Sequence, residues 1–451
     1  MKNYDIAIIG AGPGGYVAAI RAGQLGKKTV IIEKKKVGGM CLNWGCIPSK
    51  SLLESGKRFD ELKDIQKFGV DGLDPEKLQF NWGTAVKRTK RIVARLTKGV
   101  EFLLKKNKVE IMNGEASITA ERKIQVGDEL IEAENIILAT GSRPAALNIT
   151  VPEDRIIDLE KLLSEKEIPE NLVVFGSNSH AVEMAQMFSK IGKHVILNMT
   201  TDRMVPEVDP YLSEFLAKQL RKEKIEVISL GATDSDSFGD GTFQYDGKEY
   251  RYDKVVNGMP RQAVLPNIEM SIELDKQGFV RVDDGFMTSL PGTFAIGDVN
   301  GISSFAHAAS AQGLNVVNRI AGIDKPYHNE EMPINIYTVP EMAQVGLSAD
   351  KLSAEGIDFK TTEFPLTANG KALVEDKTNG FIRLLSEKKY GEVLGVQIVS
   401  HNATDMIAEA SVLRKLEGTV FDLANAVHAH PTVSEIFLES GFAAFDQPIH
   451  T

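Results

Sequence analysis

Cysteine is scarce in this sequence, and its scarcity excludes two kinds of site. The chain has 451 residues and two cysteines, Cys41 and Cys46. Two cysteines cannot form a framework of structural disulfides. A metal site would need further cysteines or clustered histidines close by, yet the chain has no other cysteine and no histidine before His180. We therefore predict no metal ligands, which leaves a redox pair or two buried structural thiols.

Long apolar runs and basic blocks are also missing. No stretch approaches the roughly 20 apolar residues of a membrane-spanning helix, and the N-terminus has no signal-peptide pattern. Acidic residues outnumber basic ones by 62 to 52, which gives a formal charge of −10. Neither a nucleic acid nor a membrane is therefore expected as a partner. We predict a cytoplasmic protein of two to four domains, because chains beyond about 250–300 residues usually divide.

The segment of residues 38–50 holds both cysteines and predicts a redox centre. Its three glycines let the backbone bend so that the two sulfurs can meet. Pro48 suits the first turn of a helix, which would place Cys46 at a helix N-terminus. There, unpaired N–H groups and the helix dipole favour the reactive thiolate.

A strand, a glycine turn and a helix follow one another at residues 4–25. Gly10 makes the tight turn, Gly12 lets the backbone approach a pyrophosphate at the helix N-terminus, and Gly15 allows close packing of helix on strand. A second strand ends at Glu33, 23 residues after Gly10, where an acid can accept hydrogen bonds from a ribose. This pattern predicts a dinucleotide-binding unit.

A second strand and glycine turn, at Gly176, look like an internal repeat of the first unit. Asn178 and Ala181 replace the second and third glycines, and Met199 replaces the ribose-binding acid. Methionine cannot hydrogen bond a ribose hydroxyl, and a side chain at position 178 obstructs the approach of phosphate to the backbone. We predict that this unit keeps its fold for packing and binds NAD weakly, or NADP through Arg203.

The remaining elements are predicted more coarsely. Residues 51–68 and 84–106 read as helices, and the basic residues of the second helix are expected to face solvent. Residues 109–130 read as a small antiparallel insertion. Residues 332–451 alternate strands and helices without a glycine turn of the nucleotide type.

Candidate ligand-contacting residues follow two further predicted strands. Thr140 and Gly141 follow the strand at residues 135–139. Asp298 ends a later strand, and a helix begins near Ala306. An acid at this place either contacts a ligand or caps the helix that follows, and spacing leaves both alternatives open.

A histidine cluster with a carboxylate lies near the C-terminus. His428, His430 and Glu435 fall within nine residues of one another. A thiol enzyme needs such a pair, because a base with a pKa near neutrality must take the proton of a thiol and return it. Alone the cluster is a weak sign, since most histidines are ordinary core or surface residues.

Together these residues resemble the flavoprotein disulfide reductases, most closely the members that oxidise dihydrolipoamide. The resemblance runs nearly end to end and rests on residues 10–33, 41–50, 140–141, 297–298, 337–341 and 428–435. It implies an α/β fold with two Rossmann-like lobes and a C-terminal α+β dimerisation domain. The implied boundaries are 1–145 for the FAD-binding domain, 146–263 for the NAD(P)-type domain, 264–331 for the return to the first domain, and 332–451 for the interface domain.

The resemblance also implies FAD as the cofactor. Glu33 would contact the adenosine ribose, Asp298 the ribityl chain, and Lys50, paired with Glu183, would lie beside the flavin ring. The further implied cofactor-binding positions are Gly10, Gly12, Gly15, Thr140, Gly141 and Ala306.

The same resemblance assigns catalytic roles. Cys41 would exchange disulfides with dihydrolipoamide or a lipoyl-bearing protein, and Cys46 would face the flavin. His430, oriented by Glu435, would be the acid–base partner and would reach the thiols from the other subunit. A homodimer with a shared active site is therefore implied.

Most of the departures from the family pattern fall in the second unit. They are Asn178 and Ala181 in the turn, Met199, the pair Ser179-His180 on the nicotinamide side, and the segment Gly258-Met259-Pro260-Arg261. Met40 and Trp44 are unusual inside the thiol motif. We predict weak or altered coupling to NAD or NADP. The alternatives are a low-molecular-weight disulfide reductase such as glutathione reductase, a flavoprotein electron carrier with a protein acceptor, and a binding module without catalysis.

Overall fold

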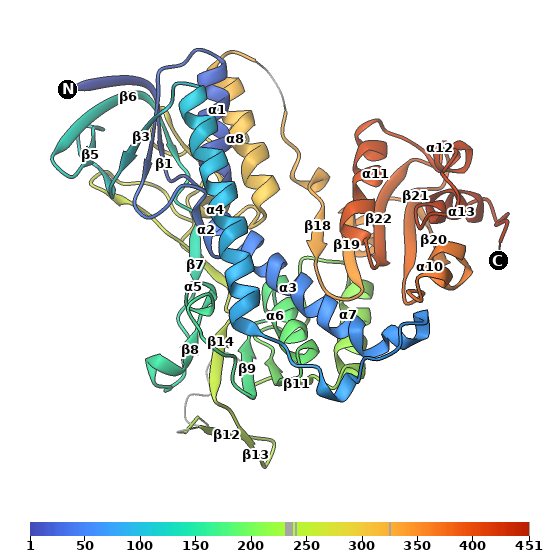
Figure 1. The fold of residues 1–451 in the computed structure, drawn as a ribbon. Coiled ribbons are helices and arrows are strands. Elements are labelled where there is room, and N and C mark those ends of the chain that lie inside the picture. Colours follow the sequence, from blue (N-terminus) through green and yellow to red (C-terminus); the bar gives the residue numbers. More distant parts are fainter. Residues whose placement is uncertain (231–237, 240, 324–325, 451) are drawn as a thin grey trace.

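The computed structural model describes residues 1–230, 238–239, 241–323 and 326–450. These residues form three five- to eight-stranded sheets and two small two-stranded ones. In Figure 1 the N-terminal and C-terminal parts of the chain lie on opposite sides, and the middle of the chain lies below them. Among the described helices, none combines the length and apolar character that crossing a bilayer requires.

The first sheet is mostly parallel, and its glycine turn lies at the carboxyl end of β1. Its order is β16-β4-β5-β6-β1-β2-β3, and β17 pairs with β6. Its strands are β1 (Lys2–Ile9), β2 (Thr29–Glu33), β3 (Glu110–Asn113), β4 (Ala116–Ile118), β5 (Ile124–Val126), β6 (Glu129–Leu138), β16 (Asn267–Ile268) and β17 (Thr293–Ala295). Strands β1, β2, β3, β6 and β17 run parallel, whereas β5 pairs antiparallel with both β4 and β6. The predicted antiparallel insertion is confirmed for β4, β5 and the start of β6, but β3, at the start of the predicted range, pairs parallel with β2 and belongs to the main sheet.

Helices cover this sheet and carry the thiol segment. They are α1 (Pro13–Gln24), α2 (Gly39–Asn43), α3 (Cys46–Glu61), α4 (Trp82–Lys106) and α8 (Ala306–Ile320), with short 3-10 turns η1 (Leu62–Phe68), η2 (Pro75–Lys77) and η5 (Gly297–Asn300). α1 packs on α8, and α3 packs on α4. The predicted helices are confirmed, except that residues 62–68 form a 3-10 turn. The basic residues Lys87, Lys90 and Arg91 of α4 are exposed, as expected.

The second sheet is wholly parallel, in the order β11-β10-β9-β14-β8. Its elements are η3 (Glu153–Arg155), β8 (Ile156–Ile157), α5 (Leu159–Leu162), β9 (Asn171–Phe175), α6 (Ser179–Lys190), β10 (His194–Asn198), α7 (Pro210–Lys222), β11 (Glu226–Ile228) and β14 (Lys254–Asn257). A hairpin of β12 (Thr242–Tyr245) and β13 (Lys248–Arg251) projects from it. β7 (Ser142–Pro144) pairs with β15 (Arg261–Ala263), so the chain enters and leaves this unit through one two-stranded ladder.

The C-terminal sheet is antiparallel, in the order β18-β19-β22-β21-β20. Its strands are β18 (Ile334–Ile336), β19 (Glu341–Gly346), β20 (Phe359–Pro365), β21 (Phe381–Glu387) and β22 (Val393–Ser400). Its helices are α9 (Ala349–Ala354), α10 (Gly370–Val374), α11 (Ala403–Lys415), α12 (Val420–Asn425) and α13 (Glu435–Ala443), with 3-10 turns η6 (Asn329–Glu331) and η7 (Leu366–Ala368).

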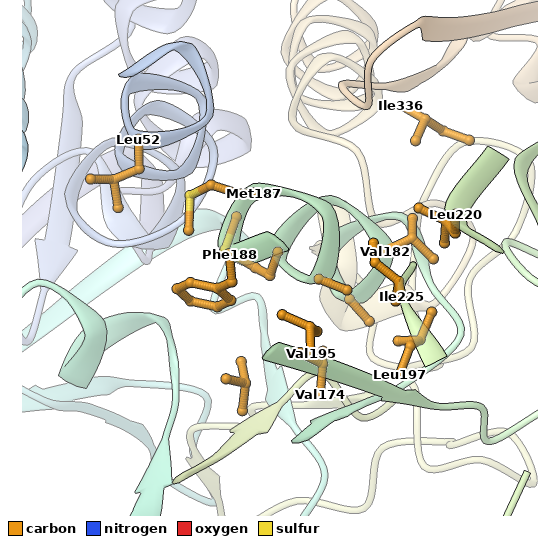
Figure 2. Close-up of a cluster of buried hydrophobic side chains, with 14 of the residues drawn as sticks. Leu52, Val174, Val182, Met187, Phe188, Val195, Leu197, Leu220, Ile225 and Ile336 are labelled. Atoms are coloured by element: carbon orange, nitrogen blue, oxygen red, sulfur yellow. The ribbon is translucent and has the colours of Figure 1, made fainter. Parts of the chain in front are cut away.

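One apolar core joins all three parts of the chain. Leu52 of α3 and Met187 and Phe188 of α6 pack in it, together with Ile336 of β18 and Val399 of β22. Figure 2 shows Leu52 and Met187 facing each other across the gap between α3 and α6. The position of the thiol helix α3 is therefore set by the second sheet unit as well as by its own.

The structure agrees with the predicted fold class. Two parallel-sheet units of Rossmann type are followed by an α+β unit, and the chain returns to the first sheet through β16 and β17. The exact boundaries at 145, 263 and 331 remain predictions.

Candidate active site

The two cysteines lie on consecutive short helices, with Cys41 in α2 and Cys46 as the first residue of α3. Both are free thiols and half-buried. The helix start predicted at Cys46 is confirmed. The thiol segment rests on the first glycine turn: Gly38 N–H donates to the Ala11 carbonyl at 2.8 Å. A Cβ on Gly39 would lie 2.6 Å from the Cα of Gly12, so only glycine permits this close approach.

Electrostatics separate the two thiols. The pKa of Cys46 is lowered first by the hydrogen bond from the Cys41 thiol and also by the positive charge of Lys50, while burial acts in the opposite direction. The pKa of Cys41 is raised, first by its hydrogen bond to Cys46 and then by burial. The start of α3 has no side-chain cap, and the backbone N–H of Cys46 itself also lowers the pKa of its thiol. Of the two thiols, Cys46 therefore has the lower pKa.

Lys50 is held beside the thiols by an ion pair with the second sheet unit. Its Nζ lies 2.7 Å from Oε2 of Glu183 on α6, whose side chain is only 1% exposed. The other oxygen of Glu183 accepts the backbone N–H of Tyr337 at 2.9 Å, and Lys50 lies 4.4 Å from the centre of the Tyr337 ring. Burial works against the charge of Lys50, but Glu183 outweighs it and the pKa of Lys50 is raised.

The first glycine turn fits the diphosphate of FAD. Gly12 is the residue that precedes α1, it makes no side-chain cap, and a Cβ built on it would meet nothing within 4 Å. The N–H groups at the start of α1 are thus open to an anion. Gly10 has a φ of +106°, and a Cβ on it would lie 2.3 Å from the Ala139 carbonyl, so this turn requires glycine.

The other predicted cofactor positions lie around this turn. Glu33 ends β2 and accepts the backbone N–H of Ala11 at 2.8 Å. The hydroxyl of Thr140 is buried and has no hydrogen-bond partner among the described residues. Ala306 begins α8, whose start also has no side-chain cap. An unpaired hydroxyl and two open helix starts suit a polar, anionic cofactor such as FAD.

Asp298 binds side chains and does not cap a helix. It lies in η5, and its Oδ2 accepts Ser142 Oγ at 2.5 Å and Arg261 Nε at 3.3 Å. The residue that precedes α8 is Phe305, so the capping alternative for Asp298 is wrong. Arg261 also donates to Sδ of Met40 at 2.8 Å, which ties the exit strand of the second unit to the residue before Cys41.

The predicted acid–base pair forms, but away from the thiols of its own chain. Nδ1 of His430 lies 2.9 Å from Oε1 of Glu435, and the backbone N–H of Thr432 donates to Oε2 at 2.8 Å. Burial raises the pKa of Glu435, but these contacts outweigh it and the pKa is lowered. The imidazole of His430 is 80% exposed. In Figure 1, α13 lies at the far side of the C-terminal unit from α2.

The second glycine turn differs from the first at the start of its helix. Oδ1 of Asn178 accepts the N–H of Ala181 at 3.0 Å, and its Nδ2 donates to the Gly258 carbonyl at 2.8 Å. Met199 packs against the core at the end of β10. Arg203 donates to the Pro206 carbonyl at 2.6 Å, so part of its guanidinium is already bound locally.

Sequence reasoning did not assign a role to Arg261, Ser142 or Tyr337. Arg261 stood out only as a departure from the family pattern, and Ser142 only as part of a strand end. Their contacts join segments more than 100 residues apart, which spacing along the chain cannot show. Among the described residues, no group of three or more His, Cys, Asp or Glu side chains is placed to hold a metal ion.

Comparison with known proteins finds matches over almost the whole chain. Residues 4–313 match the model of the pyridine nucleotide-disulphide oxidoreductase family, and residues 332–440 match the dimerisation domain of that family. A dihydrolipoyl dehydrogenase of Geobacillus stearothermophilus is 35% identical over 99% of this chain and 97% of its own length. Mitochondrial dihydrolipoyl dehydrogenase 1 of Arabidopsis thaliana is 34% identical over 99% of this chain and 91% of its own.

Solved structures have the same fold. LpdA from Mycobacterium tuberculosis superposes with a TM-score of 0.89 at 22% identity, over 98% of this chain and 99% of its own. The flavoprotein disulfide reductase RclA from Escherichia coli superposes with a TM-score of 0.83 at 21% identity, over 97% of this chain and 99% of its own.

Proposed function

The chain belongs to the pyridine nucleotide-disulphide oxidoreductase family and is an FAD-dependent disulfide oxidoreductase; from this premise we propose that its substrate is dihydrolipoamide. The single observation that carries the proposal is the thiol centre. Cys46 lies at the open start of α3, with Cys41 as its hydrogen-bond donor and Lys50 as its nearest fixed cation. The names of the relatives that match end to end supply the substrate.

The thiol chemistry proposed here is disulfide exchange. His430 takes the proton of a substrate thiol, and the resulting thiolate attacks Sγ of Cys41 in the Cys41–Cys46 disulfide. The bond between the two cysteines breaks, and Cys46 leaves as the thiolate that Lys50 and the start of α3 stabilise. The second substrate thiol then attacks the mixed disulfide, its proton passes to the departing Cys41 sulfur, and the oxidised lipoamide ring closes.

When bound, FAD accepts the two electrons of the reduced cysteine pair. The residues that would hold it are Gly12 at the diphosphate, Glu33 at the ribose, Asp298 at the ribityl chain and Lys50 at the ring. Thr140 would supply its unpaired hydroxyl. The role of this chain is to place Cys46 against the ring and to keep its charge fixed.

The dimerisation domain supports a homodimer. We propose that His430 of each subunit serves the thiols of its partner. The exposure of His430 and its separation from its own α2 support this arrangement, because a base must lie within hydrogen-bond reach of the thiol that it deprotonates. Glu435 would fix the ring orientation of His430 through Nδ1 and leave Nε2 for the substrate. The cytoplasmic location remains a prediction.

We further propose that coupling to NAD or NADP is weak or altered. Asn178 occupies the helix start where a nicotinamide dinucleotide would place its diphosphate, and Met199 offers no acceptor to a ribose. This favours an acceptor of another kind, such as an electron-carrier protein, as the second candidate. NADP remains a candidate nucleotide, because the guanidinium of Arg203 would suit its 2′-phosphate.

The proposal is tested by anaerobic mixing of the FAD-loaded protein with dihydrolipoamide, followed by NAD or NADP. We expect a long-wavelength charge-transfer band that neither nucleotide discharges at a catalytic rate. A band that NAD discharges quickly would contradict the weak coupling and leave the substrate proposal intact. Absence of flavin reduction by dihydrolipoamide, with reduction by glutathione or by a protein dithiol, would contradict the proposed substrate.

A further inference from the structure

His180 is a partly buried side chain, with one shielded and unpaired ring nitrogen, at the meeting point of the two sheet units. It is the second residue of α6, one turn before Glu183, the partner of Lys50. α6 packs on the thiol helix α3. The function described above uses Glu183 from this helix and leaves His180 without a role.

The Nε2 atom of His180 is shielded from solvent and has no hydrogen-bond partner among the described residues. Leaving a buried polar atom unpaired costs about 1–3 kcal/mol, and native structures rarely accept that cost without a reason. An apolar side chain would fill the same place at no such cost. The unpaired nitrogen therefore points to a bound group that completes its hydrogen bonding.

The neighbours of His180 show which group that is. Its imidazole lies within electrostatic reach of Lys50 and of Arg261. Lys50 and Arg261 are neutralised by Glu183 and Asp298, respectively. Cys46 is in turn within reach of Lys50 and Asp298. A flavin that takes electrons from Cys46 must lie against this sulfur, and so in the space that Lys50, Arg261 and His180 border.

We propose that His180 contacts the redox end of bound FAD through Nε2, on the side of the second sheet unit, and thereby sets the reduction potential of the flavin. This inference rests on FAD binding and not on the identity of the dithiol substrate. A hydrogen bond that differs in strength between oxidised and reduced flavin shifts the equilibrium between the two.

The imidazole acts as a neutral group. Burial, and then the charges of Lys50 and Arg261, lower the pKa of His180 to about 3. The contribution of His180 to the potential is therefore constant between about pH 6 and 8.

The test equilibrates FAD-loaded protein with a redox dye under anaerobic conditions and reads the ratio of oxidised to reduced flavin, with no dithiol present. His180→Ile removes the polar atom at similar volume, and we expect the ratio at a fixed dye potential to change by about tenfold, with a shift of the visible flavin spectrum. His180→Gln keeps a polar nitrogen at a similar reach and should restore most of both. His194→Ile, at an exposed histidine on β10, is the matched control.

An unchanged ratio and spectrum in folded, FAD-loaded His180→Ile would overturn the proposal. Should that variant fail to retain FAD, His180→Ala carries the same expectation and the same contrary outcome. Because the readout needs no dihydrolipoamide, a protein that fails to oxidise dihydrolipoamide but shows the tenfold change would contradict the proposed substrate alone. The reverse result, turnover of dihydrolipoamide with no change on substitution, would contradict the role of His180 alone.

Discussion

The two glycine-turn units of this chain share a strand–turn–helix path and differ at the N-cap residue, which directly precedes the helix. The residue before α1 is Gly12, which adds no side chain, so the first N–H groups of α1 stay open. The residue before α6 is Asn178, whose side chain accepts the N–H of Ala181 in the first turn of α6. An Asn cap stabilises a helix by about 1 kcal/mol, whereas a glycine leaves the same groups for an anion. The open start favours ligand binding and the capped start favours stability.

The helix that carries Cys46, α3, also has an uncapped start, like α1. α3 begins after Gly45 and α8 after Phe305, and neither start has a side-chain cap. All three helices expected to face FAD or the thiolate thus keep their positive ends free. The helix expected to face the nicotinamide nucleotide does not, and the following predictions test this contrast.

The largest effect is expected from closing the first turn. Gly12→Asn would place at α1 the cap that α6 has, and we expect FAD affinity to fall by roughly a hundredfold, since about two charge-assisted hydrogen bonds to the diphosphate are lost. Titration of apoprotein with FAD, followed by flavin fluorescence, measures it. Gly26→Asn, at an open position with φ +74° where Asn is tolerated, is the control. Unchanged FAD affinity in Gly12→Asn would contradict the view that an uncapped helix start is needed for ligand binding.

The reciprocal change should open the second turn. Asn178→Gly combined with Met199→Glu restores an open helix start and a ribose acceptor, and we expect NAD affinity to rise by about tenfold or more. Calorimetric titration of wild type and variant with NAD measures the gain. Wild-type protein that already binds NAD at micromolar concentration would show that the cap is no obstacle.

The charge at the start of α3 offers a third test. Cys41→Ala removes the donor that contributes most to the low pKa of Cys46, so that pKa should rise and the thiolate fraction at neutral pH should fall. Lys50→Met removes the second favourable influence and should raise the same pKa by less. Ultraviolet thiolate absorbance across a pH titration follows both variants. A Cys46 pKa that does not move in Cys41→Ala would assign the thiolate to the helix start alone.

The smallest effect concerns stability. Asn178→Gly gives up the cap and the hydrogen bond to the Gly258 carbonyl, and we expect the free energy of unfolding to fall by about 0.5–1 kcal/mol. Urea unfolding measures it. Asn178→Asp keeps the acceptor of the cap and loses only the donor to Gly258, so its free energy of unfolding should lie between those of wild type and Asn178→Gly. A more stable Asn178→Gly would contradict the view that this residue serves the fold.

Much of this site could be predicted from local sequence, because each glycine turn and the thiol segment is a short, continuous pattern. Cys46 at a helix start and Glu33 at a strand end are set by neighbours along the chain. The contacts of Arg261 with Met40 and Asp298 could not be predicted this way, since they depend on how two sheet units pack. That Asp298 does not cap α8 required the structure for the same reason.

In the second unit, sequence predicted which pattern was absent but not what replaced it. Its degenerate turn was visible in the sequence, but its replacement chemistry was not: the side chain of Asn178 bonds both its own helix and the Gly258 strand end. The residue that obstructs phosphate in the sequence pattern therefore makes two structural hydrogen bonds in the folded chain.

The ion pair of Lys50 with Glu183 gives the second unit a role apart from nucleotides. Glu183 is supplied by α6, and the same helix fills the core beneath α3. The second unit is therefore needed whether or not it binds a coenzyme, since its removal would leave Lys50 without a counter-ion and Leu52 without a packing surface. Tolerance to mutation along α6 should accordingly follow redox chemistry more closely than coenzyme choice.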